Sequence, residues 1–177
     1  AQHAAQAPER FAATLDWALR LVVIVVLPAT LALVVLAGPL TVTIFHYGRF
    51  DEHDVRMSSL ALTAYASALL AFSIVKVLAP GYFARQDTRT PVRIGIRSLA
   101  VSMGLNLLVV LPLAFVYPGR PGLHALLALN TGIGAWYNST MLYRGLRRQG
   151  VLHHASGWRR MLWQVAAGNL LMVAFLW

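Results

Sequence analysis

One stretch of this apolar chain carries residues whose types and spacing suit anion binding. Residues 79–94 read APGYFARQDTRTPVRI, and arginines recur at every fourth position from Arg85 to Arg97. Guanidinium groups bind phosphate oxygens through paired hydrogen bonds, and threonine hydroxyls and the free N–H groups of a helix start favour the same ligand. The candidate phosphate-binding residues are Lys76, Arg85, Asp87, Arg89, Thr90 and Arg93.

Proline, glycine and threonine predict where the helices on either side of this stretch end and begin. Pro80 and Gly81 predict the end of the first helix, because proline removes a backbone donor and glycine loosens the backbone. Thr90 and Pro91 predict the start of the next, since threonine is a good N-cap and proline suits the first helical position. The residues between these signals are therefore expected in a connecting loop.

A different interpretation of these basic residues stays open. If the second helix begins at Pro91, only Arg93 and Arg97 share one of its faces, near the positive end of its dipole. Cytoplasmic loops of membrane proteins also collect arginine and contact anionic lipid head groups without binding a substrate. For Lys76, the alternative to a phosphate contact is an ammonium group that snorkels to the membrane surface.

The composition predicts a membrane protein. Hydrophobic residues make up 58% of the chain and charged residues 12%, well outside the range of soluble domains. A formal net charge of +9 would favour nucleic acid as the partner of a soluble protein, but arginines between apolar segments favour anionic membrane lipids. The chain has no cysteine, which excludes disulfides, thiol catalysis and cysteine-ligated metals.

The apolar segments predict an all-α, polytopic bundle of five membrane-spanning helices. Each is long enough to cross roughly 30 Å of hydrocarbon. Residues 1–20 are more polar and are expected to form a cytoplasmic, interfacial arm along the membrane surface. The expected spans, which together form a transmembrane bundle over residues 21–177, are residues 21–45, 57–78, 98–117, 123–143 and 161–177.

Prolines within or beside the spans are candidate hinges. Pro28 lies inside the first expected span and removes one backbone hydrogen bond, so a kink is expected there. Together with Pro80 and Gly81, it is a candidate hinge for rocking between inward-open and outward-open states. Static packing of a kinked helix is the alternative.

Small and amide residues inside the spans predict contacts between helices. Asn106 and Asn130 are each able to coordinate a cation or a substrate hydroxyl, but a single asparagine in a helix more often bonds to a neighbouring helix. Alanines on the second span allow close helix contact at Ala61, Ala64, Ala68 and Ala71.

Loop charges predict the orientation, because basic loops stay on the cytoplasmic side. Residues 80–97 carry four arginines and one aspartate, and residues 144–160 carry five arginines. The hairpin at 46–56 has a net charge of −1. Loops 80–97 and 144–160 are therefore expected in the cytoplasm, and five spans alternate across the membrane without conflict.

Nothing in the sequence predicts catalysis, a cofactor or a metal site. There is no Ser/His/Asp grouping, no pair of carboxylates within the spans and no aspartate-rich magnesium motif. His53 lies between two acids, but in a short loop without supporting residues that would orient it as a ligand. Gly132 and Gly134 follow no strand and lack the third glycine of a dinucleotide fingerprint.

The stretch APGYFARQDTRTPVRI resembles the sequence between two spans in the C-terminal half of the MurJ (MviN) family, the lipid II flippases of bacterial peptidoglycan synthesis. The family's loop reads like APGFYARQDTRTPV, so Tyr82 and Phe83 invert its aromatic pair. LPATLALVVLAGPL and IFHYGRF resemble the family's preceding span and hairpin, and the likeness continues more weakly to about Arg148.

This resemblance implies a two-lobed transporter of the MOP superfamily, built around a central cationic cavity in the bacterial cytoplasmic (inner) membrane. Its substrate would be lipid II, an undecaprenyl-pyrophosphate-linked precursor, and the chain would not be an enzyme. Because the chain starts without Met and in mid-loop, we expect part of the C-terminal lobe, with the N-terminal lobe of the same protein missing.

The sequence leaves two alternatives to the lipid II flippase open. A related lipid-linked polysaccharide exporter would share the bundle and the charge bias but not the ARQDTRTP loop. A non-transporting membrane scaffold would need a partner-binding domain, which the sequence does not display.

Cysteines introduced into the full-length protein test the predicted orientation. We expect Asp51→Cys to react with a membrane-impermeant thiol reagent in intact cells, and Ser156→Cys to react only after the cells are opened, because the two positions lie on opposite sides of the membrane. Labelling of Ser156→Cys in intact cells would contradict the orientation.

Overall fold

The computed structural model describes residues 2–45, 47, 51–116, 122–152 and 157–176, and all regular structure in these residues is helical. The predicted all-α fold is therefore confirmed. The helices are α1 (Gln2–Phe45), α2 (Glu52–Phe83), α3 (Arg89–Leu105), the π-helical turn η1 (Asn106–Val110), α4 (Leu111–Val116), α5 (Leu123–Arg148) and α6 (Trp158–Leu176).

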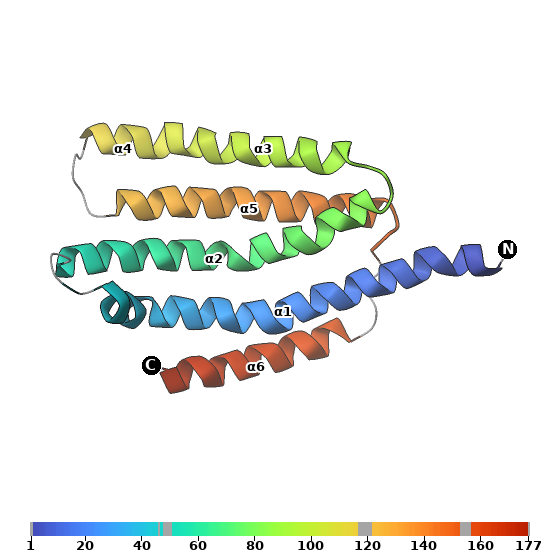
Figure 1. Ribbon diagram of the computed structural model, residues 1–177, viewed down its shortest axis with the longest axis horizontal. Coiled ribbons are helices and arrows are strands. Elements are labelled where there is room, and N and C mark those ends of the chain that lie inside the picture. Colours follow the sequence, from blue (N-terminus) through green and yellow to red (C-terminus); the bar gives the residue numbers. More distant parts are fainter. Residues whose placement is uncertain (1, 46, 48–50, 117–121, 153–156, 177) are drawn as a thin grey trace.

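The helices lie side by side in one layer (Figure 1). The order across the layer is α3 with α4, then α5, α2, α1 and α6, and the main contacts join neighbours in this order. The helix α2 therefore packs against α1 on one side and α5 on the other. A layer of single helices leaves two broad faces that no other helix among the described residues covers.

Three helical segments are long and apolar enough to cross a membrane: Glu9–Phe45, Glu52–Phe83 and Arg89–Val116. The first two expected spans fall within the first two segments, and the third expected span, 98–117, lies within the third segment as far as Val116; residue 117 lies outside the described residues. Among the described residues, α5 and α6 do not reach the same apolarity, and α5 ends in a run of arginines. That these two helices also cross the membrane stays a prediction.

The first helix runs without a break through the boundary expected at residue 20. Leu15 and Leu19 are buried in the cluster with residues of α2 and α5, and the expected arm over residues 1–20, with its position at the membrane surface, stays a prediction. The helix also continues through Pro28. Figure 1 shows the teal C-terminal end of α1 turned away from the direction of the rest of the helix. The hinge at Pro28 is likewise still a prediction.

The prediction that Pro80 and Gly81 end the second helix is wrong. The helix α2 continues to Phe83, and the N–H of Ala84 donates to the Pro80 carbonyl at 2.9 Å. Gly81 instead permits close packing, because a Cβ there would lie 3.2 Å from Leu146 Cδ1. A glycine at a tight helix contact and a glycine at a helix end are indistinguishable in the sequence.

A buried tyrosine explains why the helix continues past this glycine. Tyr82 is fully buried, and its hydroxyl donates to the Leu142 carbonyl of α5 at 2.9 Å. This bond satisfies a polar group that would be costly to bury alone. Tyr82 belongs to the main hydrophobic cluster, which joins α1, α2, α5 and the segment after α5 through Leu15, Leu19, Leu78, Tyr82, Leu142, Leu146 and Leu152.

Small residues bring α2 and α5 together along the rest of their length. Ala64, Ala68 and Ala71 are buried, as their predicted contact face requires, whereas Ala61 is half-buried. Facing them, Gly132 of α5 lies so close that an added Cβ would be 3.2 Å from the Ala68 Cβ. Close approach of this kind stabilises helix pairs in membranes through van der Waals packing.

Hydrogen bonds join α5 to the helix on its other side. Asn130 Nδ2 donates to Asn106 Oδ1 at 2.9 Å, which confirms that these two asparagines bond to a neighbouring helix. Ser98 Oγ donates to the Gly134 carbonyl at 2.6 Å. A side chain at Gly134 would collide with Ser102, so α3 also requires a small residue on α5.

Gly145→Ala tests the packing around the buried tyrosine. A Cβ at this position would collide with the Tyr82 hydroxyl, so we expect the free energy of unfolding to fall by about 1–3 kcal/mol although alanine favours helices. The measurement is the thermal unfolding midpoint of the full-length protein in detergent. Gly104→Ala, where nothing lies within 4 Å, is the control and should not lower the midpoint. Equal behaviour of the two variants would contradict this packing.

Candidate functional site

The connection after α2 is a compact turn of the Schellman type. The N–H of Gln86 donates to the Phe83 carbonyl at 2.9 Å, and the N–H of Asp87 donates to the Tyr82 carbonyl at 3.1 Å. Gln86 takes the left-handed conformation with φ of 59°. Glycine usually fills this position, so the sequence lacks the usual signal for the helix end.

Asp87 holds the start of α3. Its Oδ1 accepts the N–H of Thr90 at 3.0 Å, whereas Thr90 was predicted to be the cap. That prediction is wrong by two residues: α3 begins at Arg89, and Pro91 lies in the first turn, where its missing N–H leaves no bond unmade. Hydrogen bonds from Thr90, and then the charge of Arg85, hold the pKa of the Asp87 carboxyl below its ordinary value.

The earlier helix start places three arginines on one helical face. Arg89, Arg93 and Arg97 lie four residues apart within α3, and all three are exposed. The expectation that only Arg93 and Arg97 share a face is therefore wrong. These three residues, which we call the arginine stripe, line a shallow groove of ≈ 530 Å³ together with Val92 and Ile96.

Arg85 is not part of the arginine stripe and contacts the end of α5 instead. One of its guanidinium nitrogens, Nη1, donates to Gln149 Oε1 at 3.0 Å, which ties the α2–α3 connection to the end of α5. Both side chains are exposed. Since an arginine has five N–H donors, this bond leaves others for a ligand.

Lys76 lies within α2, before the connection that carries Arg85. It is exposed on α2, seven residues before the end of the helix at Phe83, which corresponds to a depth of about 10 Å. Ile74, two residues earlier, lines an apolar groove of ≈ 280 Å³ that crosses α1, α2 and α5. Because residues two apart on a helix point in nearly opposite directions, Lys76 faces the other side of the layer.

The six predicted residues therefore lie in four groups, and phosphate binding by any of them stays a prediction. Lys76 lies on a face of the layer, and Arg85 contacts the end of α5. Asp87 and Thr90 form the cap, while Arg89 and Arg93 belong to the arginine stripe. Their spacing in the sequence suggested a single site because the expected loop was longer than the turn that the chain forms.

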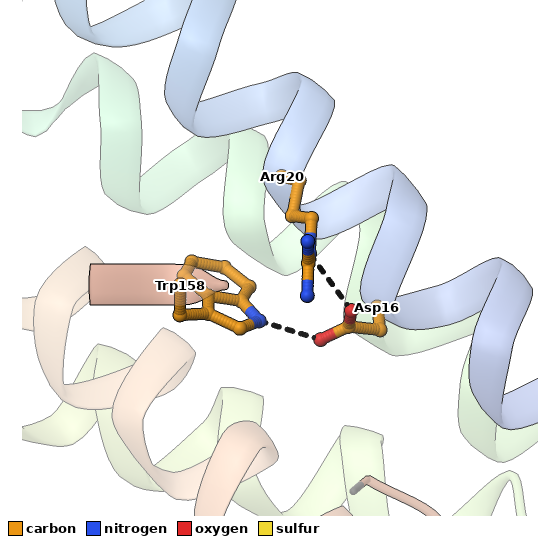
Figure 2. Close-up of polar contacts among 3 residues, drawn as sticks. All are labelled: Asp16, Arg20 and Trp158. Carbon is orange, nitrogen blue, oxygen red and sulfur yellow. Dashed lines mark hydrogen bonds and ion pairs between the residues drawn. The ribbon is translucent and has the colours of Figure 1, made fainter. Parts of the chain in front are cut away.

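The sequence did not predict a polar cluster between α1 and α6 (Figure 2). Asp16, only 4% exposed, accepts a hydrogen bond from Trp158 Nε1 at 2.7 Å and from Arg20 Nε at 2.9 Å. The Arg20 guanidinium also lies 5.4 Å from the centroid of the Trp158 ring. The available signal was an acid on the same helical face as Leu15 and Leu19, where an apolar residue would be expected.

These observations define a helical membrane protein whose basic connection and basic helix face lie at the start of α3. The family described as "Lipid II flippase MurJ" matches residues 1–177, so the chain belongs to this family. The matched residues include the whole described layer and the connection around Arg85 and Asp87.

Curated relatives support the same assignment. The probable lipid II flippase MurJ of Vibrio cholerae is 43% identical over 171 residues, which cover 94% of this chain and 30% of the relative. The lipid II flippase MurJ of Burkholderia cenocepacia is 39% identical over 166 residues, again 94% of this chain and 30% of the relative. The probable lipid II flippase MurJ of Haemophilus influenzae is 37% identical over 167 residues, 94% of this chain and 31% of the relative. The chain thus spans about 30% of the length of these relatives.

Asp87→Ala should loosen the start of α3. We expect faster hydrogen exchange at the Thr90 amide in full-length protein, because this N–H loses its acceptor. In the parent, the carboxylate cap should be present above the unfolded pKa of about 3.9 and be lost as the pH falls through the lower folded pKa. Asp87→Asn is the control: its amide oxygen can cap at any pH, so its exchange protection should not follow the carboxyl titration. Unchanged exchange in Asp87→Ala would contradict the cap.

Proposed function

We propose that this chain is a section of a flippase that moves lipid II, the lipid-linked peptidoglycan precursor, from the cytoplasmic to the outer leaflet of the bacterial inner membrane. The observation that carries the proposal is the family match along all 177 residues, with relatives named as lipid II flippases. The relatives' names describe transporters, and we propose that this chain likewise catalyses no reaction.

The open layer supports a role as part of a larger transporter. Both broad faces carry exposed apolar side chains, including Phe72 on α2 and Trp136 on α5. Since the chain spans about 30% of its relatives, we propose that the remaining sequence, including an N-terminal lobe, covers one of these faces. The cavity between the two parts would then admit the substrate head group.

Lys76 is the residue of this chain that we propose contacts the substrate pyrophosphate. Lys76 lies about two turns before the end of α2, whereas the helix end expected from the sequence was only about one turn away. Snorkelling to the surface is therefore less favourable than the sequence suggested. A cation in such a position is costly unless it faces water or an anion. Among the described residues, no carboxylate forms an ion pair with it.

The basic connections support the predicted orientation and a role for Arg85. The α2–α3 connection, the end of α5 and the start of α6 lie at the same end of the layer (Figure 1), as the predicted cytoplasmic loops would require. Residues 153–156 of the predicted loop 144–160 lie outside the described residues. We propose that Arg85, held beside Gln149 at this end, meets the pyrophosphate before it reaches Lys76.

The alternative of a lipid-linked polysaccharide exporter has less support. The ARQDTRTP loop, which such an exporter would lack, is the stretch that forms the turn and cap described above. The relatives from Vibrio cholerae, Burkholderia cenocepacia and Haemophilus influenzae are all named for lipid II.

Lys76→Met in the full-length protein tests the substrate contact. We expect it to accumulate normally but fail to sustain growth of a strain depleted of its own flippase, because the charge that attracts the pyrophosphate is gone. Lys76→Arg keeps the charge and is the matched control, so it should restore growth at least partly. The parent protein should restore growth fully, which separates failure of the proposed function from failure of the site. Full growth with Lys76→Met would remove Lys76 from the substrate site.

A further inference from the structure

The arginine stripe lies on the outer side of the helix at one edge of the layer. Ser98, which bonds to Gly134, marks the side of α3 that faces α5. Arg89 lies nine residues earlier, about 180° around the helix, and Arg93 and Arg97 follow it along the exposed surface. The groove beside them is lined by residues of α3 alone. The surface is therefore open on the side away from the rest of the layer.

No acid among the described residues compensates the charge of the stripe. All six acidic residues of the chain lie among the described residues. The one ion pair that they form in the described structure joins Asp16 to Arg20. Asp87, the nearest acid in sequence, uses Oδ1 to accept the N–H of Thr90. Two of the arginines lie in the first turns of α3, where the helix dipole disfavours cations. The stripe therefore leaves strong donors free for an external anion.

Apolar side chains continue from the stripe along the same helix. Val92 and Ile96 line the groove itself and are 58% and 63% exposed. Leu99 and Met103 extend this exposed surface toward the middle of the span. From Arg93 to Met103 the helix rises about 15 Å, which is about half of the hydrocarbon thickness of a bilayer.

We propose that the arginine stripe binds the phosphate of an anionic phospholipid from the surrounding bilayer, with an acyl chain packed along Val92, Ile96, Leu99 and Met103. An anion without a chain would leave the apolar part of this surface uncovered. A groove formed by one helix also does not enclose a soluble ion. A phospholipid satisfies both parts at once, since its charge lies at the membrane surface and its chain spans one leaflet.

Binding of phosphatidylglycerol to the full-length protein tests this inference. The protein is reconstituted in phosphatidylcholine nanodiscs and titrated with phosphatidylglycerol, and bound lipid is counted by native mass spectrometry. We expect the triple variant Arg89→Gln, Arg93→Gln, Arg97→Gln to bind phosphatidylglycerol roughly a hundredfold more weakly than the parent. The matched control removes three exposed arginines at the end of α5, through Arg144→Gln, Arg147→Gln and Arg148→Gln, and should change binding by less than about threefold.

A second variant keeps the charge in case the first does not fold. Lysine at all three stripe positions preserves insertion but cannot make paired hydrogen bonds, so we expect roughly tenfold weaker binding. Inorganic phosphate and lipid II are titrated in parallel to distinguish the sources of the phosphate. We expect inorganic phosphate to bind far more weakly than phosphatidylglycerol.

Four results would overturn the inference. Phosphatidylglycerol binding that is unchanged in both stripe variants would remove the site, and equal losses in the stripe and control triples would reduce it to general attraction by surface charge. If inorganic phosphate binds as tightly as phosphatidylglycerol, the acyl chain does not contribute to binding. If the stripe variants bind lipid II more weakly but bind phosphatidylglycerol normally, the stripe belongs to the substrate site.

Discussion

The close contact between α2 and α5 is the constraint on which the rest of the structure depends. In a membrane, helices gain little from hydrophobic burial, so their association relies on van der Waals contact between small residues and on hydrogen bonds. Gly132 against Ala68 provides the first, and the buried bond from Tyr82 to the Leu142 carbonyl provides the second. The helix α1 packs against α2, and α3 packs against α5. The contact between α2 and α5 therefore sets the positions of the helices on both sides of it.

This arrangement explains where the cations of the chain lie. Continuation of α2 to Phe83 places Lys76 two turns inside the helix, and the short turn that follows starts α3 early enough to align the arginine stripe. The end of α2 and the turn that follows it thus determine where Lys76 lies within α2 and how the arginine stripe lies along α3. Lys76 therefore lies on a broad face of the layer, and the arginine stripe lies on its outer edge.

The sequence predicted features that depend on local chemistry and missed those that depend on distant packing. The long apolar segments were sufficient for the all-α class, and the small-residue face around Ala68 was recognisable from its spacing. The end of α2 was mispredicted because Gly81 packs closely against α5 and Gln86, rather than a glycine, takes the left-handed position. The bond between Asp16 and Trp158 joins residues 142 positions apart, and nothing near either one in the sequence identifies its partner.

The most direct test of the central claim is lipid II transfer in vesicles that contain the purified full-length protein. Lipid II is placed in one leaflet, and its appearance in the other is followed with an impermeant reagent that modifies the exposed peptide. We expect transfer that depends on the protein, is faster than in protein-free vesicles, and is weak or absent for a polyprenyl-pyrophosphate sugar lacking the peptide. Transfer no faster than in empty vesicles, or equal transfer of the sugar lipid, would contradict the assignment to a lipid II flippase.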